Sequence, residues 1–149
     1  MFIFYVAMLL YFCVGAITTL GTGWYHTLAI PWWMFNDYVV AITWSVLFIS
    51  TALSASCFWD SAPRDRGFAA TLWIYMGNGL LVLLWNYFFF GLHSLSLAFL
   101  AAIAVALSLL ALIVRTKPKV KKASLYLIPY LFWMVFALYF SYSIIGPNS

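Results

Sequence analysis

Charged side chains are scarce in this sequence. Only 7% of its 149 residues are charged and 67% are hydrophobic, whereas ordinary globular domains carry about a quarter charged residues. A chain of this length buries about two thirds of the surface that its unfolded form exposes, so the remaining apolar surface must face lipid instead of water. The composition therefore excludes a soluble enzyme and a disordered regulator.

Cysteines and acidic residues are also few. Cys13 and Cys57 both lie in apolar runs, where they are interpreted as small packing residues, and this excludes a secreted scaffold held together by disulfides. The 3 acidic residues provide no paired carboxylates, no Ser-His-Asp set within range and no cluster with metal-ligand spacing. We therefore expect neither an enzyme nor a metal site.

Long uncharged runs are what the sequence has instead. A helix that crosses the ~30 Å hydrocarbon core needs about 20 mostly apolar residues. The run from Phe68 to Val114 contains no charge and would form a helix of about 70 Å, so it must fold back, with Gly91-Leu92-His93-Ser94 as the best place for the turn. We expect an all-α integral membrane bundle of five transmembrane helices in a single domain, residues 1–149, with spans at about 2–20, 38–59, 68–90, 95–114 and 123–145.

The basic residues predict how the chain crosses the membrane. All 7 lie in the second-to-third and fourth-to-fifth connections, which fall on one membrane face. By the positive-inside rule this face and the N-terminus are cytoplasmic, whereas the C-terminus, the loop 24–37 and the turn at Gly91 lie outside. The net charge of +4 is thus interpreted as a topology signal, and no nucleic-acid partner is expected. The basic residues are Arg64, Arg66, Arg115, Lys117, Lys119, Lys121 and Lys122.

Three tryptophans and two asparagines fall well inside the expected spans. An indole N–H in hydrocarbon requires a partner, so Trp44, Trp85 and Trp133 are expected to face the bundle interior, at depths of about 9, 9 and 18 Å from the outer face. The amides of Asn78 and Asn86 also require hydrogen bonds. Either a bond between helices or a contact with a ligand meets this need, and Asn86 lies nearer the outer opening.

Small residues recur at every fourth position of the fourth span, at Ser94, Ala98, Ala102 and Ala106. This spacing lets two helices approach closely, which is the usual packing device inside a bilayer. The close contact lies either within one chain or between protomers. We expect a homodimer, in addition to the lipid bilayer, among the partners.

Four segments carry more specific patterns. They read WYHTLAIPWW at 24–33, WSVLF at 44–48, WNYFFFG at 85–91 and IPYLFWMVFA at 128–137. In order and spacing these segments resemble the signatures of the TspO/MBR family, which comprises the tryptophan-rich sensory proteins and the translocator proteins. The resemblance covers essentially the whole chain, and five spans is the number that the family has.

The sequence departs from the family pattern mainly at polar positions. The family's lysine before the loop proline is replaced by Ile30, and its asparagines in the third and fifth helices are replaced by Val82 and Ser141. Polar side chains at these positions would orient a ligand. The resemblance therefore predicts the fold but leaves the identity of the ligand open.

The resemblance implies a five-helix bundle whose pocket opens beneath the first loop and accepts flat aromatic molecules. It implies a membrane receptor or binding protein for planar hydrophobic ligands such as porphyrin or haem, with a sensory or tetrapyrrole-transport role and no obligatory cofactor. Light-dependent porphyrin degradation is implied by the family alone. The expected ligand-binding residues are Trp44, Trp85, Asn86, Trp133, Ala137 and Ser141, and the expected lid residues are Trp24, Pro31, Trp33 and Phe35.

Three other interpretations stay open. His26 and His93 lie on connections assigned to the same face, and imidazole is a common axial ligand of haem iron. A facilitated transporter of small hydrophobic molecules is the second interpretation; an ion-driven transporter is not expected, because the spans contain no ionisable residue. A regulatory membrane protein that acts through partner proteins is the third.

Overall fold

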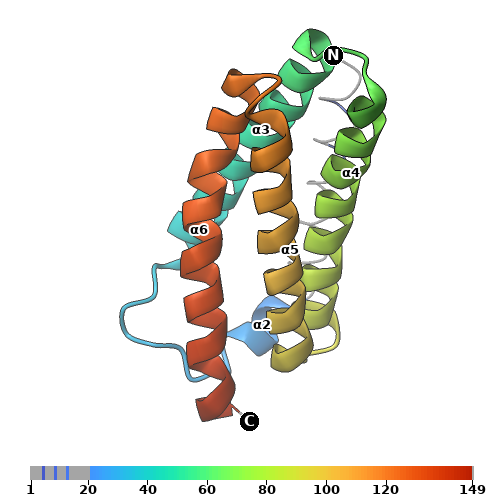
Figure 1. The fold of residues 1–149 in the computed structure, drawn as a ribbon. Helices are drawn as coiled ribbons and strands as arrows, with labels where there is room; N and C mark the ends of the chain where they lie inside the picture. Colours follow the sequence, from blue (N-terminus) through green and yellow to red (C-terminus); the bar gives the residue numbers. More distant parts are fainter. Residues whose placement is uncertain (1–4, 6–8, 10–12, 14–20, 149) are drawn as a thin grey trace.

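The computed structural model describes residues 5, 9, 13 and 21–148, and these residues contain helices but no strand (Figure 1). Four of the helices are long and apolar enough to cross a membrane. The span expected at 2–20 falls outside the described residues, except for positions 5, 9 and 13, which are helical. The elements are α2 (Thr22–Tyr25), α3 (Asp37–Ser61), α4 (Arg66–Asn86), η1 (Tyr87–Gly91), α5 (Leu95–Thr116), α6 (Lys121–Ile145) and η2 (Gly146–Asn148).

The long helices form an antiparallel membrane bundle, as the sequence predicted. Helix α6 packs against α3 and α5, and α4 packs against the other side of α5 (Figure 1). The α3–α4 and α5–α6 connections lie at one end of the bundle, which we call the basic end because it carries all 7 lysines and arginines. Helix α2, the α4–α5 turn and the end of α6 lie at the opposite end, which we call the loop end.

Polar side chains cap the first two long helices. The side-chain oxygen of Asn36 accepts the N–H of Val39 at 3.0 Å, and the carboxylate of Asp65 accepts the N–H of Gly67 at 2.9 Å. Such caps satisfy N–H groups that have no partner within the helix. They fix the starts of α3 and α4 close to the residues at which the sequence predicts these spans to begin.

The uncharged run between residues 68 and 114 folds back within the segment expected for the turn. Helix α4 continues as one π-helical turn, and the N–H groups of Leu92 and Ser94 then donate to the carbonyls of Tyr87 and Phe88, each at 2.9 Å. His93 between them has a φ of 54°, a conformation that costs a non-glycine residue energy. This tight reversal places α4 and α5 side by side.

Small side chains let α5 pack closely within the bundle. Ala98 and Ala102 are each 1% exposed, so the spacing noted in the sequence serves contacts inside one chain. Across the α4–α5 contact, the amide of Asn78 donates to the hydroxyl of Ser108 at 2.8 Å. The Asn78 amide therefore makes a bond between helices, which was one of the two alternatives open for it.

Candidate functional site

Three indoles meet inside the bundle, and we call Trp44, Trp85 and Trp133 the indole cluster. The ring centroid of Trp44 lies 5.7 Å from that of Trp85 and 6.3 Å from that of Trp133. Trp133 is thus closer to Trp44 than their expected depths implied. Helix α6 extends past its neighbours at the loop end (Figure 1), so counting residues from its end overestimates how deep Trp133 lies.

Two further aromatic rings pack against the cluster. Tyr130 is 1% exposed and meets Trp44 edge to face, with centroids 6.3 Å apart. Phe89 stacks on Trp85 at 5.6 Å. Neither ring was expected from the sequence, although Tyr130 lies three residues before Trp133 and so shares a face of α6 with it. That helical spacing was the signal that could have identified Tyr130.

Two indole nitrogens of the cluster have no hydrogen-bond acceptor among residues 5, 9, 13 and 21–148. They are Nε1 of Trp85 and Nε1 of Trp133, and both atoms are buried. A buried N–H without an acceptor costs about 1–3 kcal/mol. An acceptor that reaches these two nitrogens, such as a carboxylate or carbonyl group of a ligand, would remove this cost.

The loop between α2 and α3 runs beside α6 (Figure 1), and two of the expected lid residues stack on side chains of α6. Phe35 stacks on Trp133 at 6.5 Å, and Phe136 lies 5.4 Å from Phe35 and 5.0 Å from Trp133. Trp33 stacks on Tyr139 at 5.3 Å. Phe35 therefore connects the loop directly to the indole cluster, whereas Trp33 packs on α6 beyond it.

Of the other two expected lid residues, Trp24 belongs to helix α2 and Pro31 to the loop. Trp24 stacks on His93 with centroids 4.3 Å apart and meets Phe89 edge to face at 5.4 Å. The carbonyl of Pro31 accepts the N–H of Met34 at 3.1 Å in a turn. Trp24 thus attaches α2, after which the loop begins, to the α4–α5 turn. Pro31 forms a turn in the loop just before Trp33 and Phe35.

A side chain that was not expected from the sequence fastens the loop on its other side. Asn148 accepts the N–H of Ala29 at 2.8 Å through Oδ1, and its Nδ2 donates to the carbonyls of Ala29 at 3.3 Å and Ile144 at 2.8 Å. Asn148 and Ala29 are separated by 119 residues. No local pattern in the sequence marks such a pair.

Space remains beneath the fastened loop. An open cavity of about 370 Å³ is lined by Trp24 of α2, Leu28 of the loop, the start of α5 and Asn148. Leu28, Ile30, Trp33 and Met34 of the loop pack against the buried cluster of Phe89, Ala98, Phe140 and Ile144, so the cavity interrupts this packing only locally.

Of the remaining expected ligand-binding residues, Asn86 and Ser141 donate to carbonyls of their own helices, and Ala137 provides one of these carbonyls. Nδ2 of Asn86 donates to the Val82 carbonyl at 3.2 Å, and the hydroxyl of Ser141 donates to the Ala137 carbonyl at 2.8 Å. Asn86 is 2% exposed and Ser141 is 4% exposed. Both side chains are inside the bundle, although neither bond links two helices.

The two histidines have separate surroundings at the loop end. Nε2 of His26 lies 3.5 Å from Oδ2 of Asp37, whereas His93 is stacked on Trp24. Burial, followed by the nearby charge of Asp37, raises the pKa of Tyr25 above its ordinary value of 10.0. Within the described part of the chain, no group of three or more His, Cys, Asp and Glu residues could hold a metal ion.

Known proteins resemble the chain over nearly its whole length. The model of the TspO/MBR family matches residues 3–146. The chain is 29% identical to the uncharacterized membrane protein YtaB of Bacillus subtilis and 28% identical to the tryptophan-rich protein TspO of Bacillus cereus, in each case over 98% of this chain and 94% of the relative. It is 32% identical to the tryptophan-rich protein TspO of Chlorobaculum tepidum, over 92% of this chain and 87% of that protein. None of these names is that of an enzyme.

Proposed function

Because the chain belongs to the TspO/MBR family of membrane proteins, we propose that it is a receptor that binds planar hydrophobic ligands, such as porphyrin or haem, against the indole cluster. One observation carries this proposal. Trp44, Trp85 and Trp133 converge from three helices, and two of their N–H groups are buried without an acceptor among the described residues.

Stacking and hydrogen bonding together account for the ligand class. A flat conjugated ring gains stacking and apolar contact against indole faces, and a few polar groups fix its orientation in an otherwise apolar pocket. Porphyrin and haem carry carboxylates on a planar macrocycle, so a single molecule supplies both the flat surface and the acceptors for the N–H groups of Trp85 and Trp133.

The proposed route of entry is at the loop end. Phe35 stacks on Trp133, so the loop must move aside before a ligand reaches this face of the cluster. The positive-inside rule places the basic end in the cytoplasm, and the loop end then faces outside. A ligand is therefore expected to reach the cluster from the outer side of the membrane.

Quenching of tryptophan fluorescence by porphyrin tests this proposal. Trp44→Phe and Trp133→Phe keep an apolar ring but remove the wider stacking face, and we expect each to weaken binding by about tenfold, equivalent to about 1.4 kcal/mol. The matched control is Trp73→Phe, because Trp73 lies on α4 and is 70% exposed. Unchanged affinity in both cluster variants would refute the proposed site.

Haem ligation is tested separately. We expect His26→Ala to leave the Soret spectrum of bound haem unchanged, because His26 is more than half exposed and lies beside Asp37. A shifted Soret band in this variant, with quenching by metal-free porphyrin intact, would instead assign His26 as an axial ligand.

Flux measurements distinguish a receptor from a facilitated transporter. Proteoliposomes that contain the full chain are expected to bind labelled porphyrin without accumulating it in their lumen. Uptake that Trp44→Phe abolishes would identify transport through the same site and would replace the receptor proposal.

A further inference from the structure

At the basic end, some basic side chains have an aromatic or carboxylate partner among the described residues, and others have none. The guanidinium carbon of Arg64 lies 3.9 Å from the ring centre of Phe68 and 4.7 Å from that of Trp59, so its charge is held against two aromatic faces. Nζ of Lys119 lies 2.6 and 2.8 Å from the two carboxylate oxygens of Asp65. Within the described residues, the other five basic side chains have no carboxylate within ion-pair distance.

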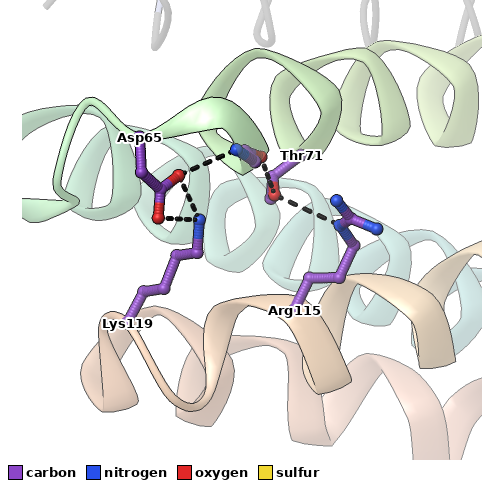
Figure 2. A network of polar contacts seen from close by, with 5 residues as sticks. Asp65, Thr71, Arg115 and Lys119 are labelled. Atoms are coloured by element: carbon purple, nitrogen blue, oxygen red, sulfur yellow. Dashed lines mark hydrogen bonds and ion pairs between the residues drawn. The ribbon is translucent and has the colours of Figure 1, made fainter.

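One of these five lies beside the Asp65–Lys119 pair (Figure 2). Nε of Arg115, in the last turn of α5, is 3.5 Å from the hydroxyl of Thr71 on α4. A Cβ added to Gly67 would lie 2.9 Å from Nζ of Lys119 and 3.8 Å from Nη2 of Arg115. Two cations therefore converge on one point at the start of α4.

This convergence leaves positive charge that the described residues do not neutralise. Asp65 pairs with Lys119, whereas Arg115 contacts the hydroxyl of Thr71 and has no carboxylate partner among the described residues. Arg115 is exposed, and its planar guanidinium can offer paired N–H groups to a phosphate. Two of the three N–H groups of the Lys119 ammonium donate to the oxygens of Asp65, so one N–H group is left for another acceptor.

We call the group of Asp65, Arg115 and Lys119 the corner. A nearby tryptophan indicates that it lies at the membrane surface. Trp59 is 41% exposed at the end of α3, and Trp is typical of the level at which lipid headgroups begin. Lys117, Lys121 and Lys122 lie around the same connection and extend the positive field.

We propose that Arg115 and Lys119 bind the phosphate group of an anionic phospholipid at this corner, where the carboxylate of Asp65 neutralises only part of their charge. Charge complementarity favours an anion, and the position at headgroup depth favours a lipid over a soluble acidic partner. The proposal does not rest on ligand binding at the indole cluster, which lies in the other half of the bundle.

Lipid retention by the full chain tests the proposal. The protein is reconstituted in nanodiscs that contain equal amounts of phosphatidylglycerol and phosphatidylcholine, and native mass spectrometry counts the lipids that stay bound after release. We expect Arg115→Gln and Lys119→Gln each to lower the ratio of retained phosphatidylglycerol to phosphatidylcholine by about five-fold. Arg115→Lys keeps the charge without the paired N–H groups and should restore part of the loss.

Two further variants distinguish a specific lipid site at the corner from general electrostatic attraction of anionic lipids to the basic end. Arg64→Gln removes the same charge from the same end, but from a residue held against Trp59 and Phe68, and should keep the wild-type ratio. Asp65→Asn keeps an oxygen for the Gly67 N–H while freeing Lys119, and should raise the ratio. Circular dichroism and a monodisperse elution profile establish that each variant is folded.

Several results would overturn the proposal. An unchanged ratio in Arg115→Gln, or equal losses in Arg64→Gln and Arg115→Gln, would remove the corner as a lipid site. Complete displacement of phosphatidylglycerol by inorganic phosphate would assign the corner to a soluble anion. A polyglutamate peptide that binds the wild type but not Arg115→Gln, with no preference for phosphatidylglycerol, would assign it to an acidic protein.

Discussion

Gly21 shows at the residue scale how a missing side chain fixes the start of the loop. A Cβ at this position would lie 2.5 Å from Cβ and 2.6 Å from the carbonyl oxygen of Phe90. The carbonyl oxygen belongs to the backbone of the π-helical turn that ends α4, so it cannot rotate away. Only glycine allows the loop to approach the end of α4 this closely.

Substitution of Gly21 should therefore destabilise the loop end. We expect Gly21→Ala to lower the free energy of unfolding by about 1–3 kcal/mol, because the methyl group forces two backbone segments apart. Gly23→Ala is the matched control: a methyl group added there would meet no atom within 4 Å, and alanine favours the helix α2 that contains it. Thermal unfolding in detergent compares the two. Equal melting temperatures for both variants would contradict the close approach.

At the scale of elements, the α2–α3 loop and the preceding helix α2 are attached to the bundle at separate points. Trp24 holds α2 to His93 at the α4–α5 turn, Asn148 holds Ala29 to the end of α6, and a cavity of about 370 Å³ lies beneath the loop. A partly exposed loop opens locally at a lower free energy than the buried core of the helices. Loosening one attachment should therefore expose the loop without unfolding the helices.

Asn148 provides the test of this view. We expect Asn148→Ala to speed amide exchange at Ala29 by about tenfold, since it removes hydrogen bonds worth about 0.5–1.5 kcal/mol each. Asn148→Asp keeps the acceptor for the Ala29 N–H but loses both donated bonds, and should give an intermediate rate. Hydrogen exchange of a peptide that covers Ala29 measures the effect, with a peptide from α5 as the internal control. Unaltered exchange in Asn148→Ala would show that other contacts hold the loop.

At the scale of the whole molecule, the Asp65–Lys119 ion pair joins the α3–α4 connection to the α5–α6 connection (Figure 2). The hydrogen bond from Lys119 is the main cause that lowers the pKa of Asp65 below its ordinary value of 3.8, and backbone N–H groups of Gly67 and Phe68 add to it. A carboxyl whose pKa is lower in the folded state stabilises the fold above its unfolded pKa. This contribution is lost as the pH falls through the folded pKa.

The pH dependence of unfolding should reflect this pair. We expect the free energy of unfolding of the wild type to exceed that of Asp65→Asn most clearly at pH values above the ordinary pKa of 3.8. At lower pH the two values should converge, because Asp65 becomes protonated. Both carboxylate and ammonium are near water, so added salt should shrink the difference. Chemical unfolding across this pH range checks it, and a difference that grows on acidification would contradict the sign.

Helix positions could be predicted from the sequence more completely than the site. The spans expected at 38–59 and 95–114 correspond to Asp37–Ser61 and Leu95–Thr116, because charges and turn residues mark the ends of apolar runs. The interior positions of Trp44, Trp85 and Trp133 were also accessible, since a buried indole needs a partner. Tyr130 and Asn148 were missed because their importance depends on neighbours from other helices.

The sequence by itself determined a membrane protein with its cations gathered at one end. Bilayer thickness sets the length of each apolar run, and the cost of buried charge confines basic residues to the connections. Only the tertiary structure decided that Trp133 comes within 6.3 Å of Trp44, that Asn148 fastens Ala29, and that Gly21 meets Phe90. These contacts depend on how far each helix is shifted and rotated against its neighbours, which side-chain packing between helices sets and no single segment encodes.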